Sequence, residues 1–258
     1  MNTRSPERLS LFASTAPGLE ALAAGELRAL GIPAVPEQGG ASWEGTLEDV
    51  HRANLHLRAA SRVLVRVATF RARTFAELER RAGRVAWDRW VGAGRAVRLR
   101  VTSRKSRLYH TGAIAERIIG QIERVAGPLA HVSTGSASDD EADGAEGRDE
   151  QLFIVRFLRD ECTISVDSSG DLLHRRGYRQ ALAKAPLRET IAAAMLLASG
   201  WDTRAPLVDP FCGSGTIPIE AALLSCRIPP GLANPSRSPR RYAFESWPDH
   251  DAAGWRDV

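Results

Sequence analysis

The decisive stretch of this chain reads Val208-Asp209-Pro210-Phe211-Cys212-Gly213-Ser214-Gly215-Thr216-Ile217-Pro218-Ile219-Glu220-Ala221-Ala222. We expect an apolar strand over 206–208, then a loop with two glycines, then an Ala/Leu-rich helix. Glycine at 213 and at 215 lacks the Cβ atom that would block a close approach, and it permits positive φ. The first turn of the helix then offers unpaired N–H groups and the positive end of its dipole to an anion. The pattern predicts a strand–turn–helix that brings backbone close to a small ligand.

Two common ligand-binding patterns do not fit this loop. A dinucleotide site reads G-x-G-x-x-G, but the third glycine position holds Pro218. A phosphate-binding P-loop needs a Gly-Lys-Ser/Thr end, and no lysine is nearby. The run instead resembles motif I of class I S-adenosylmethionine-dependent methyltransferases. The resemblance implies that the cofactor is S-adenosylmethionine and that its methionine end lies against Asp209, Pro210, Phe211, Cys212, Gly213, Ser214, Gly215 and Thr216.

The amino-acid composition indicates the broad class of protein. The chain has 258 residues, enough for two domains, of which 43% are hydrophobic and 26% charged. No stretch approaches the ~20 apolar residues of a membrane span, and the polar N-terminus lacks a signal-peptide core. We therefore expect a cytoplasmic protein without a membrane partner. The three cysteines, Cys162, Cys212 and Cys226, are far apart, so neither a disulfide framework nor a metal site is indicated.

The charge is unevenly distributed. The net charge is +4, but residues 139–150 hold seven carboxylates and one arginine. The remainder carries 34 basic and 24 acidic residues, an excess of +10. Such an excess suits a polyanion such as RNA, and arginine bias from a GC-rich genome is an alternative explanation for part of it. We interpret 133–150 as an acidic disordered linker.

Hydrophobic periodicity divides the chain into two parts. Capping boxes at Thr46 with Asp49 and at Thr74 with Glu77 each start a helix. We expect strands at 9–14, 62–69, 97–103, 152–158 and 162–166, and helices at 19–30, 46–57, 74–87, 111–125 and 187–198. These patterns predict an α+β part over 1–168, followed over 169–258 by the start of an α/β domain.

A basic cluster stands at the entrance to the helix at 111–125. It contains Arg104, Lys105, Ser106, Arg107, Tyr109 and His110. The preceding strand alternates so that Arg98 and Arg100 share one face. Arginine and lysine can engage phosphates, and Tyr109 can stack on an exposed base. Read alone, the cluster is equally consistent with an RNA contact and with an ordinary solvated loop. It resembles, however, the signature of THUMP domains, RNA-binding modules that precede RNA-modifying catalytic domains.

The following segment extends the resemblance. Residues 173–179 and 185–190 are similar to the linker and first helix of THUMP-containing guanine-N2 RNA methyltransferases, which modify 23S ribosomal RNA or tRNA. The family resemblance implies that the α+β part is a ferredoxin-like module and that the α/β part is Rossmann-like. The resemblance implies methyl transfer to the exocyclic N2 of guanine, with ribosomal RNA favoured over tRNA. It places Leu187 and Thr190 at the cofactor, and Arg175, Arg176 and Arg179 at the RNA. His110 and His174 are interpreted as structural or RNA-facing.

The catalytic motif of that family is not found. Members use a later Asn/Asp-Pro-Pro-aromatic motif that holds the flipped base. Arg227-Ile228-Pro229-Pro230 lacks the amide and the aromatic residue, and Asn234-Pro235 lies only 25 residues after Asp209. No catalytic residue is assigned, and we expect the chain to be C-terminally truncated. A non-catalytic RNA-binding protein and a DNA adenine-N6 methyltransferase remain alternatives.

Overall fold

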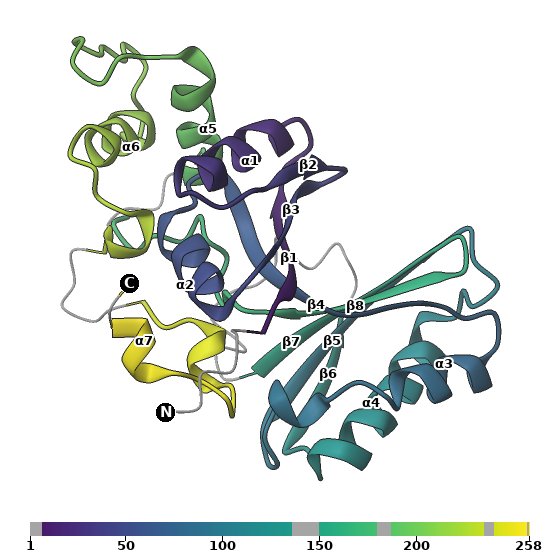
Figure 1. Ribbon diagram of the computed structural model, residues 1–258. Coiled ribbons are helices and arrows are strands. Elements are labelled where there is room, and N and C mark those ends of the chain that lie inside the picture. The colour runs from purple at the N-terminus through teal and green to yellow at the C-terminus, as the bar shows by residue number, and fades with distance from the viewer. Residues whose placement is uncertain (1–6, 136–149, 180–186, 235–239, 257) are drawn as a thin grey trace. The chain divides into compact units, whose positions relative to one another are not determined.

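The computed structural model describes residues 7–135, 150–179, 187–234, 240–256 and 258 (Figure 1). The chain forms two compact units. The first consists of Met1–Val63, Asp171–Tyr242 and Ala253–Val258. The second consists of Leu64–Gly170 and Ala243–Ala252. Each unit is described by itself.

The first unit begins with a β-α-β-β-α-β arrangement. Its elements are β1 (Leu9–Thr15), α1 (Glu20–Ala29), β2 (Val35–Glu37), β3 (Gly40–Gly45), α2 (Leu47–His56) and the first residues of β4 (Ala60–Arg71). The strand order is β2-β3-β1-β4, and β3 is antiparallel to both β1 and β2. This element sequence and strand order are those of a ferredoxin-like fold, as the sequence predicts.

Local sequence signals explain where the helices of this part begin. The Thr46 N–H donates to Asp49 Oδ2 at 2.8 Å, which completes the predicted capping box at the start of α2. Such a cap contributes about 1 kcal/mol. The apolar faces of α1 and α2 supply Leu27, Val50 and Ala53, all fully buried, to a core shared with Leu11 of β1.

The later part of the first unit is helical. It contains α5 (Glu189–Ser199), α6 (Thr216–Ser225), the 3₁₀ turn η3 (Pro230–Leu232) and most of α7 (Ala252–Arg256). α5 ends at Gly200, whose φ of 64° is left-handed, as expected for a C-terminal glycine. α5 and α6 pack together.

The predicted strand at 206–208 is wrong. These residues have no regular structure, and Val208 is 85% exposed. A strand exists only where a neighbour accepts and donates its backbone hydrogen bonds. In the part of the chain that the structure describes, the strands are β1 to β8, and none of them pairs with 206–208.

The second unit is a mixed sheet with helices. Its elements after β4 are α3 (Phe75–Ala82), η1 (Trp87–Arg89), β5 (Ala96–Arg104), α4 (Thr111–Ala126), β6 (His131–Gly135), β7 (Glu150–Leu158), β8 (Glu161–Asp167) and η4 (Ala243–Ser246). The strand order is β4-β8-β7-β5-β6. β5 is parallel to β6 and β7, and the other pairs are antiparallel. α4 packs on β5 and on α3 (Figure 1).

Aromatic and aliphatic side chains fill the second unit's core. Trp87 meets Phe153 edge to face, with ring centroids 5.3 Å apart. Ile114, Ile118 and Ile122 of α4 are fully buried, whereas Val125, one residue before the end of the helix, is 37% exposed.

A two-residue turn joins β7 to β8. Arg159 and Asp160 have φ of 52° and 65°, the left-handed pair that tight hairpins require. The strands predicted at 152–158 and 162–166 are confirmed as β7 and β8. Its Asp160 also accepts a hydrogen bond from the Arg107 N–H at 2.8 Å, so the turn supports the loop that follows β5.

The expected linker at 133–150 extends into two strands. Residues 133–135 lie in β6 and Glu150 begins β7, because both strands pair with β5. Residues 136–149, with most of the acidic run, lie outside the described residues. The two compact units differ from the two domains expected on either side of residue 168, since residues 1–63 cluster with 171–242. That domain boundary stays a prediction.

Candidate functional site

The loop from Asp209 to Gly215 has the backbone that the sequence predicts. Gly213 and Gly215 have φ of 53° and 76°, which side-chain-bearing residues rarely adopt. Among the described residues, a Cβ added at Gly213 would come no closer than 4.0 Å to another atom, the Phe211 carbonyl oxygen. The glycines are therefore needed for the left-handed turns, and the space beside them is open to a ligand.

Hydrogen bonds hold the loop in its turned shape. The Phe211 N–H donates to Asp209 Oδ1 at 3.0 Å, and the Gly215 N–H donates to the Cys212 carbonyl oxygen at 2.7 Å. α6 begins at Thr216, and its N-cap, Gly215, has no side chain that could cap the helix. The first N–H groups of α6 are thus available to an anionic group at the end of the loop.

The loop lies at the surface of its unit. Phe211 is 93% exposed, and Cys212 and Ser214 are exposed as well, whereas Thr216 is only 5% exposed. The loop therefore presents its backbone and the Phe211 ring outward, while the start of α6 is anchored.

Arg179 connects the predicted cofactor residues. Its Nε donates to Glu189 Oε1 at 2.9 Å, and its Nη2 donates to the Leu187 carbonyl oxygen at 2.7 Å. The same Nη2 lies 3.5 Å from Thr216 Oγ1. The structure thus brings Leu187, two residues before α5, and Thr216 together around one guanidinium, with Thr190 buried on α5.

This placement corrects the role expected for Arg179. Its side chain is 17% exposed and is occupied by the contacts to α5 and α6, so it supports the loop rather than presenting a cation to RNA. The sequence carries no signal for these contacts, because Arg179 and Thr216 are far apart along the chain.

Arg176 does not have its expected role as an RNA contact either. It forms a buried ion pair with Glu220 of α6, and the two side chains are 1% and 0% exposed. Arg176 Nη2 donates to the Arg58 carbonyl oxygen at 2.6 Å, and the Tyr178 hydroxyl donates to Glu220 Oε1 at 2.8 Å. Burial raises the pKa of Glu220, while the Arg176 charge and the Tyr178 hydrogen bond oppose that rise. Arg176 is structural and cannot contact RNA in this fold.

A second buried glutamate continues the polar cluster. The Glu26 carboxylate accepts the N–H groups of Arg58 and Ala59 at 2.8 and 2.9 Å. Burial raises the pKa of Glu26. Arg58 Nη2 donates to the Ile228 carbonyl oxygen at 2.7 Å, just beyond the end of α6. The cluster therefore ties α6 to the ferredoxin-like part of the same unit. Sequence reasoning missed both glutamates; the one available signal was a lone acid within the apolar run of α6.

His174 gives this unit a pH-dependent stability. Burial and the nearby Arg188 and Arg175 lower its pKa from 6.5 to about 4. Between these values the unfolded chain binds more protons than the folded one. The contribution of His174 to the free energy of unfolding is therefore fully present above about pH 6.5 and is lost as the pH falls toward about 4. We expect His174→Gln to remove on the order of 2 kcal/mol of this pH dependence. Urea unfolding across that range checks it; the exposed His131→Gln is the control, and equal pH profiles for both variants would contradict it.

The basic cluster after β5 is mostly open to solvent. Arg104, Lys105, Arg107, Tyr109 and His110 are exposed, and Tyr109 and His110 have ring centroids 4.1 Å apart. Ser106 faces inward: its hydroxyl accepts the Asp160 N–H at 2.9 Å and donates to the Arg104 carbonyl oxygen at 3.0 Å. The contact with Asp160 thus holds the loop against the β7–β8 turn, and the cations and aromatic rings of the loop are exposed.

The two arginines on β5 are not part of that open surface. Arg100 is 4% exposed, and Arg98 Nε lies 3.3 Å from Glu150 Oε2. On the face that they share, Arg100 is buried, so the expected RNA contact of Arg100 is wrong for this fold. Arg98 is half-buried, and its expected RNA contact stays a prediction. Arg175 keeps a side chain 34% exposed, 3.8 Å from Asp171 Oδ1.

Comparisons with known families identify both parts of the first unit. Residues 10–64 match the family model of the RlmL ferredoxin-like domain, and residues 176–246 match the model described as "RMKL-like, methyltransferase domain". The chain thus contains a ferredoxin-like domain and an RlmKL-like, Rossmann-like methyltransferase domain. This confirms the predicted fold class and the predicted methyltransferase class, whereas the role of the glycine loop stays a prediction.

Individual relatives agree with this class. The chain is 36% identical to "Putative RNA methyltransferase slr0064" of Synechocystis sp., over 96% of this chain and 61% of that protein. It is 38% identical to the ribosomal RNA large subunit methyltransferase K/L of Syntrophotalea carbinolica, over 96% of this chain and 34% of that one. A solved structure described as "SMU.472, a putative methyltransferase complexed with SAH" has 31% identity and a TM-score of 0.79, covering 97% and 63% of the two chains. The chain therefore spans between a third and two thirds of these relatives.

The described residues show neither a membrane span nor a metal cluster. None of their helices is both long and apolar enough to cross a membrane. No group of three or more His, Cys, Asp or Glu side chains among them is arranged to hold a metal ion.

Proposed function

We propose that this protein is an S-adenosylmethionine-dependent RNA methyltransferase, acting on the exocyclic N2 of a guanine in 23S ribosomal RNA. The observation that carries the proposal is the Asp209–Gly215 loop. It has two left-handed glycines and leads into an uncapped helix, within a segment that matches a methyltransferase domain.

The residues present fit the methionine end of the cofactor. The open space beside Gly213 allows a close backbone approach, and the first N–H groups of α6 suit a carboxylate. Arg179 fixes the Leu187 carbonyl and the Thr216 hydroxyl relative to each other, which pre-orders the loop. When bound, S-adenosylmethionine supplies an electrophilic methyl group on its sulfonium. No residue of this chain is assigned to the transfer step itself.

The proposed RNA contact is the loop of Arg104, Lys105, Arg107, Tyr109 and His110, which we interpret as the signature of a THUMP module. Exposed cations can neutralise phosphates, and the exposed aromatic rings can stack on unpaired bases. The names of the relatives, an RNA methyltransferase and a methyltransferase of the large ribosomal subunit RNA, support RNA as the partner.

Replacing Arg104, Lys105 and Arg107 together with glutamine should lower the affinity for RNA and flatten its salt dependence. For each phosphate that the variant no longer neutralises, the slope of log K against log[salt] should fall by about 0.7–0.9. Fluorescence anisotropy with a labelled ribosomal RNA hairpin over a salt series measures both quantities. The matched control replaces Arg84, Arg95 and Arg124 of the same unit. If the two triple variants behave alike, the loop is an ordinary solvated surface.

A labelled-methyl assay ranks the alternatives. The assay mixes the full-length gene product with S-adenosylmethionine that carries a labelled methyl group. Ribosomal RNA, tRNA and duplex DNA are added in separate reactions. We expect label in ribosomal RNA, released as N2-methylguanosine on digestion. Label in tRNA alone would favour a tRNA enzyme, and label in DNA alone a DNA adenine methyltransferase. RNA binding without methylation of any substrate would favour a non-catalytic RNA-binding protein.

A further inference from the structure

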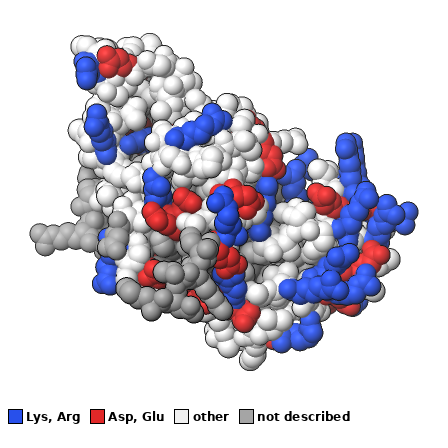
Figure 2. All heavy atoms as spheres, in the orientation of Figure 1, with Lys and Arg blue, Asp and Glu red and all other residues white. Residues whose placement is uncertain are grey.

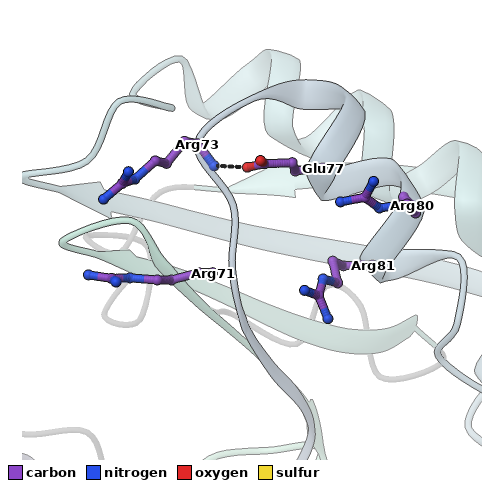
Figure 3. Close-up of a pocket in the computed structure, with 5 residues that line it drawn as sticks. All are labelled: Arg71, Arg73, Glu77, Arg80 and Arg81. Carbon is purple, nitrogen blue, oxygen red and sulfur yellow. Dashed lines mark hydrogen bonds between the residues drawn. The ribbon is translucent and has the colours of Figure 1, made fainter.

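A cavity in the second unit is surrounded almost entirely by arginines. It has a volume of about 260 Å³ and is lined by Arg71, Arg73, Glu77, Arg80 and Arg81 (Figure 3). None of these residues belongs to the glycine loop or to the basic cluster at 104–110.

Two separate elements bring the arginines together. Arg71 is the last residue of β4, and Arg73 follows two positions later, before α3 begins. Arg80 and Arg81 stand in the last turn of α3. Glu77, one helical turn earlier, lies between the two pairs in Figure 3, where its carboxylate accepts the Arg73 N–H at 2.7 Å. The Thr74 cap fixes the start of α3, because its hydroxyl oxygen accepts the Glu77 N–H at 3.2 Å.

The charges of this cavity are poorly compensated. In the described part of the chain, no carboxylate forms an ion pair with Arg71, Arg80 or Arg81. Arg73 Nε lies 3.3 Å from Asp160 Oδ2. Glu77 is the one acidic lining residue; the hydrogen bond from the Arg73 backbone, together with the nearby Arg80 and Arg73 charges, lowers its pKa. Four cations thus lie near two carboxylates, Glu77 and Asp160, and of the four only Arg73 forms an ion pair among the described residues.

Helix electrostatics explains only half of this arrangement. Basic residues in the last turn of a helix interact favourably with its dipole, which accounts for Arg80 and Arg81 on α3. It does not account for Arg71 and Arg73, which come from the strand and lie on the same cavity. The four arginines are exposed, so water weakens their mutual repulsion, and a bound anion would turn the remaining repulsion into attraction.

We propose that this cavity binds a phosphodiester group of the RNA backbone. The proposal rests on RNA being the substrate. Planar guanidinium groups match the oxygen pairs of a phosphate, and a concave site with several arginines suits a single phosphate better than a flat lipid surface.

Asp160 connects a residue of the cavity to the proposed RNA loop. Asp160 contacts the Arg73 guanidinium on one side and the Arg107 N–H on the other. Figure 2 shows Lys and Arg side chains gathered over α3 and the neighbouring strand ends of this unit. In this proposal one RNA molecule places a phosphate in the cavity and also contacts the loop at 104–110, where Tyr109 and His110 are exposed on the same unit.

The test compares two variants that remove the same charge. Arg80→Gln/Arg81→Gln alters the cavity, and Arg84→Gln/Arg95→Gln alters arginines of the same unit that do not line it. Anisotropy with the labelled ribosomal RNA hairpin should show a roughly tenfold or greater loss of affinity for the cavity variant, with a salt slope smaller by about 0.7–0.9 for each phosphate left unbound. The control should weaken binding by no more than about threefold. Circular dichroism verifies that both variants fold.

The possible outcomes separate this inference from the proposed function. If the unaltered protein binds RNA and both variants weaken binding equally, the cavity site is overturned while RNA binding stands. If the unaltered protein does not bind RNA, both proposals are overturned. Loss of binding to vesicles of anionic phospholipid, with RNA affinity unchanged, would assign the cavity to a membrane surface instead. Inorganic phosphate should compete with RNA for binding to the control variant. If it does so and does not compete for the cavity variant, the result supports the site.

Discussion

Glu220→Gln should lower the free energy of unfolding by about 3–5 kcal/mol, because it leaves the Arg176 charge buried without its partner. The two side chains are almost completely excluded from solvent, and glutamine keeps the size of glutamate while removing the charge. Since a domain is typically stable by only about 5–15 kcal/mol, this change would remove a large share of the total. Urea unfolding followed by tryptophan fluorescence measures it.

An exposed ion pair provides the control. Arg117 Nη1 lies 2.6 Å from Glu79 Oε1, but these side chains are 48% and 35% exposed. Glu79→Gln should therefore change stability by less than about 1 kcal/mol despite the short distance. The double variant Arg176→Met/Glu220→Met should be less damaging than Glu220→Gln, because no unpaired charge remains. Equal, small effects of Glu220→Gln and Glu79→Gln would show that burial of the pair has been misjudged.

The features that sequence predicts well here are local. The capping boxes at Thr46 and Thr74, the glycine at the end of α5 and the two-residue hairpin all depend on residues within a few positions of one another. The left-handed turns of the glycine loop belong to the same class. Their geometry follows from the backbone preferences of the residues themselves, so no tertiary contact is needed to specify them.

The features that sequence misses depend on distant partners. Alternation places Arg98 and Arg100 on one face of β5, but only the folded sheet decides that Arg100 is covered. Arg176 and Arg179 look like exposed cations until Glu220 and Glu189 are brought beside them. The expected strand at 206–208 likewise depended on a neighbouring strand that its own residues cannot specify.

The arginine cavity is a further example of a site without a motif. Arg71 and Arg73 read as polar residues at the end of a strand, and Arg80 and Arg81 as basic residues in the last turn of a helix. Each pair has an ordinary explanation by itself. Only the turn at 72–74 between β4 and α3 brings them to one cavity, so the charge distribution along the chain could indicate a polyanion partner but not its position.

Gly213→Val should weaken the binding of S-adenosylhomocysteine by the full-length gene product by on the order of a hundredfold, about 2.8 kcal/mol. Gly213 has a left-handed φ of 53°, and a branched side chain there both strains the turn and fills the open space on which the ligand would lie.

Gly200→Val separates these two effects. Gly200 is also left-handed, with φ of 64°, and nothing in the described structure lies within 4 Å of a Cβ added there. Both variants should be destabilised to a similar extent, by about 1–2 kcal/mol, because each forces a β-branched residue into the same backbone region. Only Gly213→Val should also weaken ligand affinity by calorimetric titration. If the two variants bind equally well, the affinity does not depend on backbone approach at this loop, and the cofactor must lie elsewhere.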